Sequence, residues 1–284
     1  MVKLRAMFPR KIKVCDAFGI PVYLDFSLII LLVIFATSGG PFVLSMACAL
    51  MLLVSITAHE LGHALAARAF GYGTRDITLS LLGGCASLIA LPRKAWQEFL
   101  TAIAGPAVSF MISILALSFV ASLTTGSVIG FALYRLSGGW FGTPQLVCDE
   151  KVFWIVDLLL DIGLMNLMLG MFNLLPGFPM DGGRVFRSAM RAVMSRARAT
   201  YVAMIVGRGV AILLGLWGLS KIVNRGSWGF VTILIAWMIW REGWREYQMA
   251  RMEENVRGWG NDWSARVSPP PYGGSGDDVE IRED

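Results

Sequence analysis

The sequence predicts an all-α polytopic membrane protein with about six transmembrane helices and short β-strands at the membrane edge. Of its 284 residues, 56% are hydrophobic and only 16% are charged, whereas an ordinary soluble domain has about 25% charged residues. A soluble core of this size cannot bury so much apolar surface. The apolar residues are also grouped into long runs, which is typical of membrane-spanning helices.

The elements expected along residues 1–240 form one transmembrane domain. The basic N-terminus leads into two extended pieces around Gly19-Ile20-Pro21, and we expect a β-hairpin over residues 11–23. Six apolar segments follow, at about residues 22–38, 41–70, 98–123, 152–175, 201–222 and 228–240. The second to fifth are long enough to cross about 30 Å of hydrocarbon, whereas the first and last are short.

Two further stretches do not fit a helical span. Thr74–Leu88 alternates in its first half and then meets a Gly pair, which indicates strands and a turn near membrane depth, covered by protein or by a water-filled cavity. Residues 241–284 are expected to form a cytoplasmic tail. From about residue 268 the tail is rich in Pro, Gly and acidic residues, which predicts disorder.

Basic residues predict the orientation. With the N-terminus in the cytoplasm and six spans, 20 Lys and Arg lie on the cytoplasmic side and four on the opposite side. This bias follows the positive-inside rule and places both termini in the cytoplasm. The net charge of +5 is therefore explained by the orientation of the protein in the membrane, and no nucleic acid is expected as a partner.

The only two histidines lie four residues apart in His59-Glu60-Leu61-Gly62-His63, inside the second apolar segment. On a helix, positions i and i+4 share one face, so the two imidazoles can hold one zinc ion. Glu60 can then reach the metal-bound water as a base. The alternative is a pair of helix-packing histidines, but an ionisable triplet within an apolar helix is costly and points to function.

Zinc needs at least one more protein ligand, which here is an Asp, Glu or Cys because the chain has no third His. The best candidate is Asp181, at the cytoplasmic end of the fourth segment and at the same expected depth as the histidines. Pro176 and Pro179 interrupt the helix there. The alternative is an ordinary Pro/Asp/Gly turn at the end of a span.

Three motifs together resemble the site-2 protease family of intramembrane zinc metalloproteases. They are the H-E-x-x-H motif, the pattern Asn173-x-x-Pro176-x-x-x-x-Asp181-Gly182, and Ala104-Gly105-Pro106 in the span between them. The resemblance is to a minimal type, because the chain offers no room for a PDZ domain or paired CBS modules. At the position of Ser109 the family commonly has Asn.

The resemblance implies a role for each matching residue. It implies His59, His63 and Asp181 as zinc ligands and Glu60 as the catalytic acid/base. Asn173 and Asn166 would contact the substrate backbone or the developing oxyanion. The strand expected after the Gly pair would pair with an unwound substrate through Gly83, Gly84, Cys85, Ala86 and Ser87.

The expected function is hydrolysis of a peptide bond within or near the transmembrane segment of a single-span protein, such as a tethered regulator or a signal-peptide remnant. A regulatory membrane partner is expected, the location is the bacterial inner membrane, and the oligomeric state is left open.

One alternative is an inactive scaffold that binds transmembrane helices. Another is a transporter that uses Asp157, Asp161 and Arg208, and we expect Arg208 to pair with one of these aspartates.

Overall fold

Four helices of the protein are long and apolar enough to cross a membrane. The computed structural model describes residues 11–37, 42–80, 83–89, 92, 94–137, 147–149, 152–223 and 229–266. Within these residues the four helices are α2 (Phe42–Ala69, apolar from Ser45), α3 (Ala95–Leu123), α5 (Phe153–Asn173) and α7 (Arg196–Val223). They coincide with the second to fifth apolar segments, and the chain is a multi-pass integral membrane protein.

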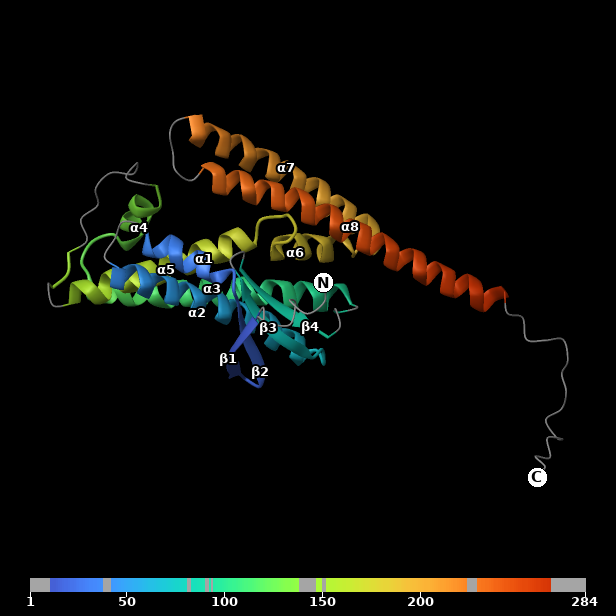
Figure 1. The fold of residues 1–284 in the computed structure, drawn as a ribbon, viewed down its shortest axis with the longest axis horizontal. Helices are drawn as coiled ribbons and strands as arrows, with labels where there is room; N and C mark the ends of the chain where they lie inside the picture. The colour runs from blue at the N-terminus through green and yellow to red at the C-terminus, as the bar shows by residue number, and fades with distance from the viewer. Residues whose placement is uncertain are drawn as a thin grey trace, which may run out of the picture.

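The long helices form two groups (Figure 1). Helices α2, α3 and α5 pack side by side, and α7 packs along α8 (Gly229–Arg266). The short helix α6 (Asp181–Met190) contacts both α3 and α7. It therefore lies where the two groups of helices meet.

A four-stranded sheet covers one flank of α2. Its strands, in the spatial order β1-β2-β3-β4, are β1 (Lys11–Ala17), β2 (Ile20–Asp25), β3 (Thr74–Ser80) and β4 (Gly83–Leu88). The outer pairs are antiparallel hairpins and the central pair, β2 with β3, is parallel. Alternate apolar side chains such as Ile20 and Ile77 are fully buried and belong to the same core cluster as Ile56 of α2. This packing fixes the sheet against the helix that carries both histidines.

The first expected span was placed too early in the chain. Val22 and the residues up to Asp25 form strand β2, because its backbone pairs with β1 on one side and with β3 on the other. The helix that follows, α1 (Leu28–Ala36), has nine residues and is about 14 Å long. That length is less than half of a hydrocarbon core of about 30 Å; the end of the expected segment, Ser38, lies outside the described residues.

The last expected span is part of a much longer helix. Residues 229–240 open α8, whose 38 residues continue to Arg266, so the first half of the expected tail is helical. This helix is not among the four long, apolar helices of the described chain, and six spans stay a prediction. The disorder predicted from about residue 268 falls outside the described residues.

The expected pairing of Arg208 with an aspartate of the fourth span is wrong. Arg135 of α4 (Val128–Ser137), a helix that the sequence reading did not include, lies 3.1 Å from Asp157 and 2.8 Å from Asp161. The guanidinium of Arg208 instead lies over the rings of Trp240 and Trp244 in α8, 4.6 and 5.4 Å from their centroids. Arg208 thus joins α7 to α8 by cation–π contacts.

Candidate metal centre

Helix α2 presents His59, Glu60 and His63 from its buried face. The i, i+4 spacing brings the two imidazole rings to a centroid separation of 4.9 Å in an edge-on arrangement. All three side chains are buried in the protein. The helix therefore holds two nitrogen donors and a carboxylate away from bulk water.

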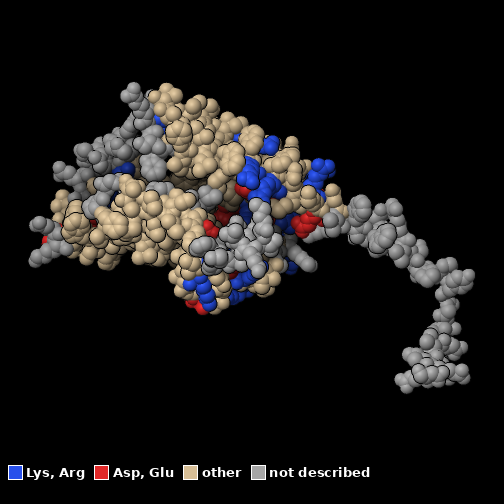
Figure 2. All heavy atoms as spheres, viewed as in Figure 1, with Lys and Arg blue, Asp and Glu red and all other residues tan. Residues whose placement is uncertain are grey.

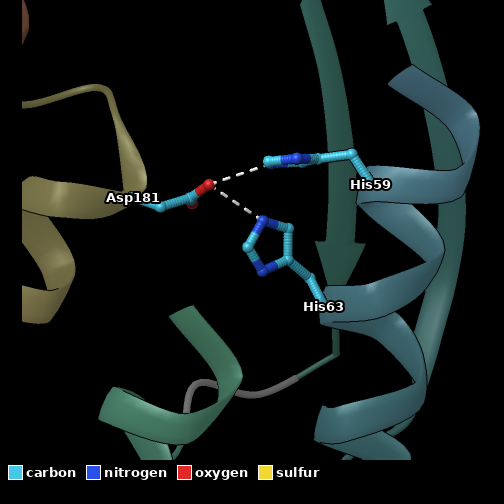
Figure 3. Close-up of side chains that lie close together, drawn as sticks. All are labelled: His59, His63 and Asp181. Atoms are coloured by element: carbon cyan, nitrogen blue, oxygen red, sulfur yellow. Dashed lines mark hydrogen bonds and ion pairs between the residues drawn. The ribbon is translucent and has the colours of Figure 1, made fainter. Parts of the chain in front are cut away.

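Asp181 faces this pair from the first turn of α6 (Figure 3). Its Oδ2 atom lies 3.1 Å from Nε2 of His59 and 3.0 Å from Nε2 of His63. Burial raises the pKa of the Asp181 carboxyl, but the two imidazoles that contact it outweigh this effect and hold the pKa well below its usual range. The carboxylate is consequently ionised at neutral pH.

The outer nitrogens of both histidines have partners on α3. Nδ1 of His63 lies 2.7 Å from the backbone oxygen of Thr101, and Nδ1 of His59 lies 2.9 Å from Oγ of Ser109. A carbonyl oxygen can only accept, so Nδ1 of His63 carries a proton, and Nε2 is the ring atom turned toward Asp181. The hydroxyl of Ser109 can accept from His59 in the same way. This is the arrangement in which histidines bind a metal ion.

These donors fit a zinc ion. Two imidazole nitrogens and one carboxylate oxygen, all within 4.8 Å of one another, are a ligand set that catalytic zinc sites use. In a tetrahedral zinc site, neighbouring ligand atoms lie about 3.3 Å apart, close to the 3.0 and 3.1 Å found between Asp181 and the histidines. A zinc ion at the centre of these three atoms would be coordinated by all of them.

Gly105 of α3 leaves the space that this centre needs. A Cβ atom at this position would lie 2.2 Å from Nε2 of His63 and 2.7 Å from Nε2 of His59, well inside van der Waals contact. Any side chain there would displace the very nitrogens that face Asp181. The Ala-Gly-Pro motif thus supplies a gap beside the ligand atoms.

Glu60 is held against the edge strand β4. Its Oε2 atom accepts a hydrogen bond of 2.9 Å from the backbone N–H of Ala86. At Gly84 a Cβ atom would lie 2.4 Å from Cγ of Glu60, so only glycine leaves room for this carboxylate. The structure therefore brings Gly84 and Ala86 to Glu60. The other three residues expected to pair with the substrate also belong to β4, namely Gly83, Cys85 and Ser87.

The two asparagines belong to α5. Asn166 is fully buried and donates hydrogen bonds of 2.9 Å to Oγ of Ser55 on α2 and to the backbone oxygen of Ile162. Asn173 ends α5 and donates to the backbone oxygen of Leu169. The structure thus assigns Asn166 a contact between helices, and substrate contact of either residue stays a prediction.

The sequence did not predict that Glu98 and Thr101 of α3 lie beside the motif residues Gly105 and Ser109. Glu98, Thr101, Gly105 and Ser109 lie three, four and four residues apart and are all buried. Such spacing puts them on one face of the helix. Polar and small residues at this spacing in an otherwise apolar helix were the available signal.

Comparisons with known proteins agree with this geometry. Residues 47–216 match the model of peptidase family M50. The chain is 34% identical over 86% of its length to "Putative zinc metalloprotease sll0528" of Synechocystis sp. and 29% identical over 85% to "Zinc metalloprotease MJ0392" of Methanocaldococcus jannaschii. It spans 62% of the length of each of these relatives.

A solved structure shares the arrangement of helices and sheet. The site-2 protease from Methanocaldococcus jannaschii matches with a TM-score of 0.57 and 28% identity, over 84% of this chain and 95% of that chain. The family resemblance predicted from the three motifs is confirmed. The chain belongs to peptidase family M50, the site-2 protease family of zinc metalloproteases.

Proposed function

We propose that this protein is an intramembrane zinc metalloprotease that hydrolyses a peptide bond within or near the transmembrane segment of a single-span membrane protein. The observation that carries the proposal is that Asp181 of α6 meets His59 and His63, which lie beside Glu60 on α2, a helix long and apolar enough to span a membrane. The names of the relatives support zinc as the cofactor.

His59, His63 and Asp181 would hold the zinc ion through Nε2, Nε2 and Oδ2. Zinc in such a site lowers the pKa of water and polarises a carbonyl group. Glu60, one residue from His59, would take the proton from the attacking water and return it to the leaving amine.

The edge strand β4 would position the substrate. In the described sheet, β4 pairs with β3 on one side only, so its other edge can pair with an extended peptide by strand addition. The hydrogen bond from Ala86 to Glu60 lies on β4 itself, and a substrate strand on this edge would bring its peptide bonds next to the base. A transmembrane helix must unwind locally to pair in this way, because its own carbonyls are hydrogen-bonded.

The charge distribution supports a cytoplasmic location of the site. Lys and Arg on the visible face gather around the sheet, α6 and the adjoining part of α8, and are sparse at the end that carries α4 (Figure 2). Under the positive-inside rule, the basic end, with both termini, faces the cytoplasm of a bacterial cell with the protein in its inner membrane. We propose a tethered regulator or a signal-peptide remnant as the substrate and a membrane protein as a regulatory partner.

The deciding experiment is Glu60→Gln in the full chain, reconstituted in lipid vesicles with a single-span reporter. We expect one zinc per chain in both proteins and cleavage by the wild type only. Glu242→Gln, which changes a carboxylate on α8 that pairs with Arg245, is the matched control and should leave cleavage intact. Persistent cleavage by the Glu60 variant would overturn the role of the base. Reporter binding without zinc or cleavage in the wild type would favour the scaffold.

A further inference from the structure

A buried cluster of charges ties α6 to two other helices. The guanidinium of Arg187 in α6 donates to Oε1 of Glu98 in α3 from Nε and Nη2, at 2.9 and 2.6 Å, and to Oε2 of Glu246 in α8 from Nη1, at 3.0 Å. Arg191, the C-cap residue that follows α6, pairs with the other oxygen of Glu98. The Arg187 side chain is only 3% exposed. Two carboxylates thus meet two guanidinium groups where three helices join.

The same arginine contacts the loop that leads into the metal centre. Its guanidinium lies 5.0 Å from the ring centroid of Phe178, a side chain that is almost fully buried. At the start of α6, a Cβ atom on Gly182 would lie 2.3 Å from the backbone oxygens of Leu174 and Leu175. Helix α6 is therefore packed backbone to backbone at its first turn and fixed by charge at its last.

The partner helix α3 is the one that also orients the histidines. Glu98 lies on the face of α3 that carries Thr101, the carbonyl partner of His63, and Ser109, the hydroxyl partner of His59. The contact between Arg187 and Glu98 therefore connects the helix that carries Asp181 to the helix that holds both imidazole rings. A shift of α6 along α3 would change the distances from Asp181 to His59 and His63 directly.

We infer that Arg187 is a positioning residue: through Glu98 and Glu246 it fixes α6 so that Asp181 stays opposite the histidines. The part of α8 beyond residue 241, which the sequence analysis expected to be a cytoplasmic tail, supplies Glu246, one of the two carboxylates that bind Arg187. Further contacts of the same part of α8 hold α7, from Glu253 to Arg196 and from Glu254 to the backbone N–H of Ala197. The inference rests on the proposed function, because it assumes that Asp181 binds zinc.

The bridging of two carboxylates by one guanidinium separates this role from simple charge balance. A guanidinium presents several donors in a rigid plane, whereas an ammonium is a single point charge. Arg187→Lys can pair with one carboxylate but cannot hold α3 and α8 together. Arg187→Gln removes the ion pairs with both Glu98 and Glu246, and Glu246→Gln removes only the ion pair with α8.

The test measures how fast zinc leaves the full chain in detergent, below its unfolding temperature, when a colorimetric chelator is added in excess. We expect release to be about tenfold faster in Arg187→Gln, the lower end of the range for outer partners of metal sites. Glu246→Gln and Arg187→Lys each keep one of the two contacts, so we expect a smaller effect, about threefold. On the reporter, kcat should fall with KM unchanged, because β4 is intact. Arg245→Gln, an exposed residue on α8, is the control and should match the wild type.

The outcomes distinguish this inference from the proposed function. Wild-type release and kcat in folded Glu246→Gln or Arg187→Lys would overturn the positioning role, even if the melting temperature fell, and would leave the protease assignment standing. These two variants also decide the matter if Arg187→Gln does not fold. A wild-type chain without zinc would overturn both.

Discussion

Gly105 faces His63 so closely that a Cβ atom on the glycine would lie 2.2 Å from Nε2 of the imidazole. The same atom would lie 2.7 Å from Nε2 of His59. The close approach explains in steric terms why a glycine stands between Ala104 and Pro106 in the middle of a membrane-spanning helix, where it is otherwise unfavourable. Helix α3 and helix α2 approach each other at the point where His59 and His63 project.

Gly105→Ala should therefore destroy the metal centre. We expect more than about a 100-fold loss of zinc affinity, beyond the range for changes in outer partners, because the methyl group displaces both ligand nitrogens. Metal analysis of the purified chain measures this. Gly209→Ala in α7, where a Cβ atom would meet nothing within 4 Å, is the control and should keep its zinc. Normal zinc content in Gly105→Ala would show that the ligands lie elsewhere.

Ser109 should matter through His59. Ser109→Ala leaves Nδ1 of His59 without its partner at 2.9 Å, which frees the ring to rotate and lowers its basicity. We expect zinc affinity to fall about 10- to 100-fold, measured by competition with a chelator of known affinity. Ser113→Ala changes the next buried serine on the same face of α3 and should have no such effect. Equal zinc affinities in the two variants would contradict this role.

Gly84→Ala should impair the base and spare the metal. The added methyl group would push Glu60 away from Ala86, and we expect kcat to fall about 10- to 100-fold, part of the contribution of a well-placed general base. Zinc content should not change, since the three atoms nearest to such a methyl group all belong to Glu60. Gly73→Ala, where a Cβ atom would meet only the side chain of Ile89, is the control. A parallel loss of zinc in Gly84→Ala would argue for a general disturbance of the sheet.

The long helices and the closeness of His59 and His63 could be predicted because each rests on a local pattern. About 20 consecutive apolar residues define a span wherever they occur, and the H-E-x-x-H motif of α2 needs only helical spacing to bring His59 and His63 together. Asp181 was the best candidate for a third ligand because of its expected depth at the end of the fourth segment, and the resemblance to a family motif supported this choice. The position of Asp181 at the first turn of a helix was not foreseen, because two prolines and two glycines around it read as a turn.

Features that depend on contacts between distant segments could not be predicted in this way. Val22 reads as the start of an apolar helix, but its strand pairs with β3 some 50 residues further along the chain. The partner of Arg208 depends on how α7 rotates against α8, and the apolar pattern does not define that rotation. The charges of α8 after residue 241 read as a soluble tail for the same reason, since their partners lie on α6 and α7.

The ion pairs of Arg135 give a prediction that separates the two possible partners of the aspartates in α5. Asp157 and Asp161 lie four residues apart on one face, so without Arg135 two carboxylates repel each other. Because Arg135 is 36% exposed, we expect Arg135→Gln to cost only about 1 kcal/mol, measured by thermal unfolding in detergent. When Arg135→Gln is combined with Asp161→Asn, the loss of stability should be smaller than the sum of the two single losses.

The control is Arg208→Gln, because Arg208 contacts Trp240 and Trp244. Its loss of stability should be additive with that of Asp161→Asn. The reverse pattern would restore the pairing of Arg208 with α5 and would contradict the packing of α7 on α8.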